Sequence, residues 1–176
     1  WMNSLKDCGI SGPVILNVSA TSGPHMMGQD LGAISGSSAT NTVTMNGNGT
    51  TVNRGTGNYF LALNGITHTT IENFKFINES PATNMFGIHM RGGCDSITIK
   101  NNTINLGLGS TSSLMVGITA SNLLTSATSY GNNADNVTID GNTIIGGYYG
   151  IRMNGTSTSV RNTGHKIINN TIVRIS

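Results

Sequence analysis

The stretch Thr138-Ile139-Asp140-Gly141-Asn142-Thr143-Ile144 sets two short apolar-polar arms around an Asp-Gly-Asn turn, and the chain contains four copies of this pattern. The other copies are Thr70-Ile71-Glu72-Asn73-Phe74-Lys75-Phe76, Thr98-Ile99-Lys100-Asn101-Asn102-Thr103-Ile104 and Lys166-Ile167-Ile168-Asn169-Asn170-Thr171-Ile172. A repeated unit of this kind cannot bury its apolar face alone and gains a core only by stacking on its neighbours. The sequence therefore predicts a solenoid.

The spacing of the copies is regular except in one interval. Ile71 and Ile99 are 28 residues apart, as are Ile139 and Ile167, whereas Ile99 and Ile139 are 40 residues apart. The longer interval contains residues 121–136, which are rich in Ser, Thr, Asn and Gly. Because this composition is typical of loops, we predict a loop insertion at 121–136.

Each copy alternates apolar and polar residues, which predicts strands that bury one face and stack in parallel on the next coil. Three copies carry an asparagine at the turn: Asn102, Asn142 and Asn170. Asparagine tolerates the left-handed backbone of a turn, and stacked amides can hydrogen-bond to the amides above and below. We predict a structural asparagine ladder at these positions, with ligand contact as the alternative.

The Asn-Asn-Thr-Ile and Gly-Asn-Thr-Ile phrases, followed by Tyr149-Gly150-Ile151, resemble the repeats of right-handed parallel β-helices in pectate-lyase-like proteins. Residues 5–14 and 32–41 are similar to the opening of secreted bacterial β-helix modules. The resemblance implies an all-β fold: a single right-handed parallel β-helix of about five to six coils over residues 1–176, with an N-terminal cap in 1–13. It implies no activity, because this fold carries lyases, hydrolases, adhesins and structural proteins alike.

The composition of the chain limits the classes of partner and the cellular location that we expect for it. The chain has 9% charged residues, a formal net charge of +2 and no basic stripe, so we predict no nucleic-acid partner. It has no apolar run of about 18 residues, so we predict no membrane span. The first residues lack the features of a secretion signal. We interpret the chain as mature or excised, and extracellular or at a cell surface.

The two cysteines are distant in the predicted stack. Cys94 lies about three coils beyond Cys8, a separation of roughly 14 Å at ~4.8 Å per coil. A disulfide requires Cα atoms within about 7 Å. We therefore predict no bond between them within one chain; two buried thiols or a link between molecules are the alternatives.

The two ends differ. Trp1, Leu5 and Cys8 have the spacing of one helix face, which predicts a helical cap on the first coil. The last residues stop in the middle of a coil without a capping segment, so Ile172 and Ile175 are predicted to be uncovered. Either the sequence is part of a longer protein, or this end docks on the next subunit and builds a filament.

The best catalytic candidates are Glu72, Lys100 and Asp140, which share one outward position in consecutive coils. Sugar cleavage uses paired carboxylates, or calcium with a basic residue, so a cofactor is expected only under this enzyme hypothesis. The alternative is a surface ion-pair ladder. We favour the ladder, because a lysine paired on both sides remains protonated.

A second predicted surface row runs through Ala62, His89, Thr119 and Arg152, with Arg91 two residues beyond His89. His89, Arg91 and Arg152 are candidates for binding an anionic sugar. No carboxylate is expected in register with them. No histidine pair has metal-ligand spacing, so we predict no metal site.

These observations favour a secreted, non-catalytic structural or adhesive module that associates end to end, through Trp1, Leu5, Ile172 and Ile175. A polysaccharide lyase or hydrolase, or a fragment of one, is the first alternative. A carbohydrate-binding module is the second, with polysaccharide as partner in both.

Overall fold

The computed structural model describes residues 2–21, 23–79, 82–107, 111–156 and 161–174. In this part of the chain, one helix, α1 (Met2–Cys8), precedes short strands that form three parallel sheets. The predicted all-β fold is confirmed, since the sheets stack as a β-solenoid of about five turns.

The three sheets are named A, B and C in the order in which the chain visits them. Sheet A contains β1 (Val14–Asn17), β4 (Val43–Asn46), β7 (Thr67–Glu72), β10 (Cys94–Lys100), β14 (Thr138–Asp140) and β17 (Lys166–Ile168), with β13 (Ala134–Asp135) also paired to β10. Sheet B contains β2 (His25–Met27), β5 (Thr51–Arg54), β8 (Lys75–Ile77), β11 (Thr103–Asn105), β15 (Thr143–Ile145) and β18 (Thr171–Val173). Sheet C contains β3 (Gln29–Gly32), β6 (Tyr59–Asn64), β9 (Met85–Arg91), β12 (Met115–Ala120) and β16 (Tyr149–Met153).

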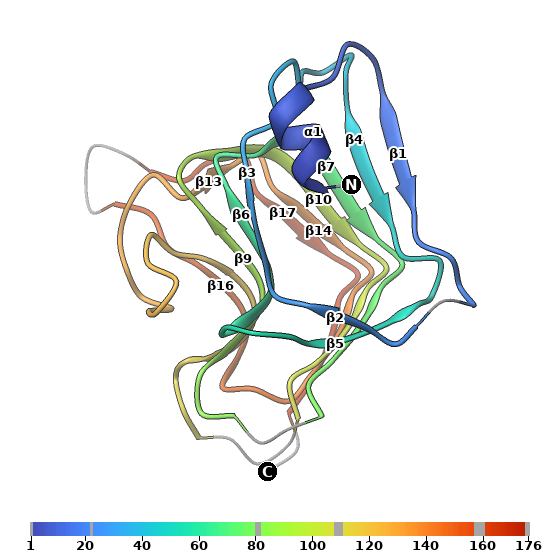
Figure 1. Ribbon diagram of the computed structural model, residues 1–176. Helices are drawn as coiled ribbons and strands as arrows, with labels where there is room; N and C mark the ends of the chain where they lie inside the picture. The colour runs from blue at the N-terminus through green and yellow to red at the C-terminus, as the bar shows by residue number, and fades with distance from the viewer. Residues whose placement is uncertain (1, 22, 80–81, 108–110, 157–160, 175–176) are drawn as a thin grey trace.

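Each turn passes through sheets A, B and C and then returns to sheet A one strand further on. In Figure 1 the path from β1 through β2 and β3 to β4 runs clockwise, and later coils lie farther from the viewer. This is the predicted right-handed sense, which parallel crossover connections almost always adopt.

The repeats align in the predicted register. Ile99 pairs with Ile71 on one side and with Ile139 on the other, and all three are 0% exposed. Sheet B stacks the second inward row, which contains Phe76, Ile104, Ile144 and Ile172. Full burial of one such side chain contributes roughly 1.5–3 kcal/mol, so these rows are a main source of stability.

The turn between sheets A and B carries the predicted asparagine ladder. The Nδ2 of Asn102 donates to the Oδ1 of Asn142 at 3.0 Å, and the Nδ2 of Asn142 donates to the Oδ1 of Asn170 at 3.0 Å. Asn102 and Asn142 are each 1% exposed. The left-handed backbone lies one position before the ladder, at residues such as Asn101 (φ 55°) and Gly141 (φ 65°). The three asparagines of the ladder do not themselves adopt the left-handed backbone that the sequence suggested, and hydrogen bonds hold them in place.

A glycine column in sheet C lets the core close tightly. Gly87, Gly117 and Gly150 stack at the place where isoleucines of sheet B approach the backbone. A Cβ on Gly117 would lie 2.5 Å from the Cγ2 of Ile144 and 2.6 Å from the carbonyl oxygen of Gly150. Only a glycine leaves room for this contact.

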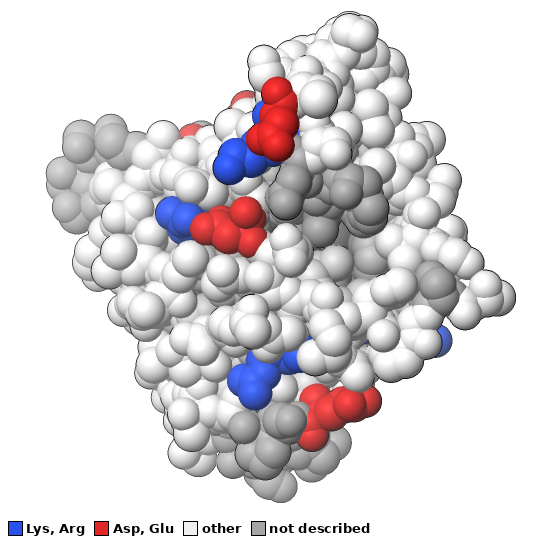
Figure 2. Space-filling view, in the orientation of Figure 1, with Lys and Arg blue, Asp and Glu red and all other residues white. Residues whose placement is uncertain are grey.

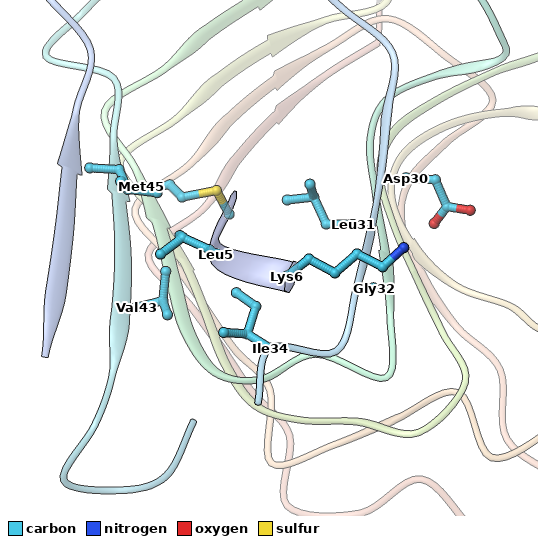
Figure 3. Close-up of a pocket in the computed structure, with 9 residues that line it drawn as sticks. Leu5, Lys6, Asp30, Leu31, Gly32, Ile34, Val43 and Met45 are labelled. Atoms are coloured by element: carbon cyan, nitrogen blue, oxygen red, sulfur yellow. The ribbon is translucent and has the colours of Figure 1, made fainter. Parts of the chain in front are cut away.

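Helix α1 caps the N-terminal end. Figure 3 shows Leu5 pointing toward Met45 and Val43 of β4, and Lys6 extending across Gly32 of sheet C. Leu5 packs against the main core, as the sequence predicted. Cys8 does not share this face and is exposed. Trp1 lies outside the described residues.

The cysteines are free thiols, which confirms that they do not pair within the chain. Cys94 is buried, but the interpretation of two buried thiols is wrong for Cys8, because the end of α1 faces solvent.

Charge is sparse on the face shown in Figure 2, where most Lys and Arg side chains lie near Asp or Glu.

Candidate functional site

Glu72, Lys100 and Asp140 form the predicted column on sheet A. Lys100 is in register with both carboxylates, and its Nζ lies 3.0 Å from the Oε2 of Glu72. Among the described residues Asp140 joins no ion pair; its Oδ1 accepts a hydrogen bond from the Nδ2 of Asn169 at 2.9 Å. The predicted acid-base-acid ladder is therefore one ion pair followed by one amide hydrogen bond.

This geometry favours a surface ion pair over a catalytic base. An ammonium held against a carboxylate has no lone pair with which to abstract a proton. The Lys100 side chain is 42% exposed and that of Glu72 is 16% exposed. Ion pairs at this level of exposure stabilise a protein by about 0–1 kcal/mol.

The row on sheet C is in the predicted register but is not a surface row. Ala62, His89, Thr119 and Arg152 are paired across β6, β9, β12 and β16. The first three are 0% exposed, which contradicts the prediction that this row lies on the surface. A loop covers this side of the sheet, and the sequence pattern of the strands contained no sign of it.

The covering segment is residues 121–133, within the predicted insertion. Phe86 packs against Ala127 of this segment in a small second apolar cluster. The Nδ2 of Asn154 donates to the carbonyl oxygen of Ala127 at 2.6 Å, and the Nδ2 of Asn133 donates to the carbonyl oxygen of Asn154 at 2.6 Å. The last part of the predicted insertion forms β13 instead of loop.

His89 anchors the start of this segment. A nitrogen of its ring, Nε2, donates to the carbonyl oxygen of Ser121 at 2.7 Å, and the ring meets the Phe86 ring edge-on, with centroids 4.9 Å apart. Burial lowers the pKa of His89; Arg91 lowers it further, while the bond to Ser121 and the charge of Asp30 oppose the shift. His89 is thus a neutral structural imidazole rather than a cation open to a sugar.

Arg91 has a carboxylate partner that the sequence analysis missed. Its Nη2 lies 2.6 Å from the Oδ2 of Asp30, which is in register with Ala62 and hence with the His89 row. The expectation that no carboxylate accompanies the row is therefore wrong. Strand β3 carries no copy of the repeated phrase, so the register of Asp30 was not visible in the sequence.

Arg152 also makes its contacts within the chain. Its guanidinium lies over the Tyr149 ring at 4.5 Å from the centroid, and its Nε donates to the Oδ1 of Asn154 at 3.2 Å. His89 and Arg152 therefore share one register row, with Thr119 between them, and Arg91 lies two residues beyond His89, but each of the three makes a contact within the chain.

The C-terminal face of the solenoid, defined here by Ile167, Ile172 and Val173 of β17 and β18, exposes apolar side chains. Their exposed fractions are 48%, 52% and 36%, whereas Ile139 and Ile144, one coil earlier, are 0% exposed. No described strand pairs with the outer edges of β17 and β18. This face is the strongest candidate for contact with another molecule. Ile175, also predicted for assembly, lies outside the described residues.

The last turn of the solenoid is cationic. Residues 141–176 contain no Asp or Glu and four basic residues: Arg152, Arg161, Lys166 and Arg174. Among the described residues, none of these four forms an ion pair. The sequence analysis considered only the net charge and the absence of a basic stripe, and it missed this segregation, which a count of charged residues along the chain shows.

A cleft of about 370 Å³ opens beside this turn. Arg161, Asn162 and His165 line it together with Met153. Burial lowers the pKa of His165, and Asp135 opposes the shift. The Nδ2 of Asn162 donates to the carbonyl oxygen of Asn154 at 2.6 Å, which fixes this wall of the cleft to the residue that directly follows β16.

The described ranges lack two kinds of feature. They contain no group of three or more His, Cys, Asp or Glu side chains placed to hold a metal ion. They also contain no helix that is long and apolar enough to cross a membrane.

Comparison of the chain with protein-family models, with curated proteins and with solved structures finds no match. The resemblance of its repeats to those of pectate-lyase-like proteins therefore stays a prediction, while the β-solenoid itself is established by the parallel sheets.

Proposed function

We propose that this chain is a secreted, non-catalytic structural or adhesive module that associates end to end with further copies of itself. The observation that carries the proposal is the exposed C-terminal face. Two rows of buried isoleucines end there in Ile167 and Ile172, which are about half exposed. A solenoid coil buries its apolar residues only when another coil stacks on it.

The contact joins unlike ends: among the described residues, helix α1 lies at the end that carries β1 and β2, and no helix lies at the end that carries β17 and β18. Head-to-tail contacts of this kind do not close and generate a filament. Unpaired strand edges also supply backbone N–H and C=O groups that can continue each sheet into the next copy.

Two features support a role without catalysis. Lys100 is held in an ion pair with Glu72, and residues 121–133 cover the polar row of sheet C. The low charge and the resemblance of the repeats to secreted pectate-lyase-like and bacterial surface β-helix modules support an extracellular location.

The test is sedimentation velocity over a range of concentrations for the chain and for Ile172→Lys. A lysine at this place on the C-terminal face puts a charge into the contact, so the variant is expected to sediment as a monomer where the unchanged chain forms larger species. Leu123→Lys is the matched control, because Leu123 is also 52% exposed but lies in the covering loop.

Circular dichroism of both variants verifies that the strands remain. A chain that stays monomeric at all concentrations contradicts the proposal. Equal association of Ile172→Lys and the unchanged chain contradicts the role of the C-terminal face.

A further inference from the structure

We infer that helix α1 of one copy seats against the C-terminal end of the next copy, over β16, with Asp7 beside Arg161. The inference rests on the proposed function and deepens it, because it names the two surfaces that meet when one copy stacks on another.

The two ends of the solenoid have complementary outlines. At the C-terminal end, sheets A and B reach β17 and β18, whereas the last described strand of sheet C is β16, one coil earlier. At the N-terminal end, α1 lies over β3 of sheet C, and β1 and β2 are the outermost strands of the other two sheets (Figures 1 and 3). Pairing β1 with β17 and β2 with β18 therefore brings α1 over β16.

Strand β16 is suited to receive a cover. All its residues are half-buried, whereas its neighbour β12 is buried throughout. Met153 of β16 is in register with Ala120 of β12, which is 0% exposed. A helix seated on β16 would cover that strand as α1 covers Leu31 and Gly32 of β3 within its own chain.

Within its own chain, the segment just after α1 stacks on the turn that follows β3. The backbone N–H of Ile10 donates to the carbonyl oxygen of Ser35 at 2.8 Å. Ser35 lies between β3 and β4, where the chain passes from sheet C to sheet A. The turn that makes the same passage between β16 and β17 carries Arg161. Stacking thus brings the end of α1 to Arg161.

The charges of the two ends are opposite. Residues 1–36 contain one basic residue, Lys6, and two acidic residues, Asp7 and Asp30, whereas residues 141–176 contain four basic residues and no acidic one. Asp30 is already paired with Arg91. Asp7 is exposed and, among the described residues, forms no ion pair, and the same holds for Arg161. Each is available to the other across the contact.

Cys8 provides a probe inside the inferred contact. It is exposed at the end of α1, whereas Cys94 is buried, so alkylation by iodoacetamide reports on Cys8. If α1 enters the contact, the alkylation rate of Cys8 falls as protein concentration rises and the copies associate.

A charge exchange tests the pairing of Asp7 with Arg161. Asp7→Lys and Arg161→Glu are each expected to weaken association roughly fivefold, and the double variant Asp7→Lys/Arg161→Glu is expected to restore it. Asp7→Lys does not threaten α1, because a basic residue is favourable in the last turn of a helix. Glu79→Lys, an exposed carboxylate between β8 and β9, is the control and should leave association unchanged.

The outcomes separate the inference from the proposed function. If the chain associates while Cys8 reacts at the same rate at every concentration and the charge exchange has no effect, α1 is outside the contact and the inference is wrong, but end-to-end association stands. If the chain is monomeric throughout, both are wrong.

Discussion

Asn142 shows at the scale of one residue how the coils are held in register. Its Oδ1 accepts hydrogen bonds from the backbone N–H and the Nδ2 of Asn102, both at 3.0 Å. Its own Nδ2 donates to the carbonyl oxygen of Ile99 at 2.9 Å and to the Oδ1 of Asn170. One side chain therefore satisfies polar groups of three consecutive coils.

Asn142→Ala is expected to lower the free energy of unfolding by roughly 2–4 kcal/mol, because each buried polar group left without a partner costs about 1–3 kcal/mol. Urea unfolding followed by circular dichroism measures the change. Asn122→Ala, at an exposed position in the covering loop, is the control and should stay within about 0.5 kcal/mol. A ladder variant as stable as this control would show that the amides are replaceable.

His89 makes stability depend on pH. Burial holds its pKa below the ordinary value of 6.5, so protonation favours the unfolded chain. The stability that neutral His89 provides is present above the unfolded-state pKa and is lost as pH falls from about 6.5 through the lower folded-state pKa. His165 shifts in the same direction.

Unfolding measured at several pH values between about 7.5 and 5 should show this loss, and His89→Gln should reduce it because glutamine does not titrate in this range. The hydrogen-exchange protection of residues 121–133, corrected for the intrinsic pH dependence of amide exchange, should fall as the pH is lowered over this range, since a charged imidazole whose Nδ1 is buried without a partner favours opening of the segment that covers it. An unchanged pH profile in His89→Gln would mean that His89 does not titrate on unfolding.

At the scale of the element, the glycine column decides how closely sheet C approaches sheet B. Gly117→Ala is expected to destabilise the chain by roughly 1–3 kcal/mol, because the added methyl meets Ile144 and the backbone of Gly150. Thermal unfolding measures the effect. Gly12→Ala is the control, since nothing lies within 4 Å of a Cβ at that position. Equal melting temperatures for the two variants would contradict the close packing of the column.

The repeated phrase was enough to predict the stacking of β7, β10, β14 and β17, because Ile71, Ile99 and Ile139 mark equivalent positions. Strand β3 has no such phrase, so the partner of Arg91 was missed. The burial of His89 was missed for another reason. The covering loop is a single, non-repeated insertion, and no periodic pattern shows where such a segment packs.

At the scale of the whole molecule, the two ends of the described solenoid differ. Helix α1 seals the first coil through Leu5, while Ile167, Ile172 and Val173 are left exposed on the last strands. The basic residues without acidic neighbours are gathered at the open end. The proposed head-to-tail assembly rests on this asymmetry, because a contact between unlike ends does not close into a dimer.

The most direct test of end-to-end association is electron microscopy of the purified 176-residue chain at concentrations where sedimentation detects larger species. Sheet B is six strands deep, so head-to-tail stacking at ~4.8 Å per strand predicts fibres with an axial repeat of roughly 29 Å. Fibres with this repeat, absent in Ile172→Lys, are the result that we expect. Discrete particles one solenoid long at every concentration would contradict the account.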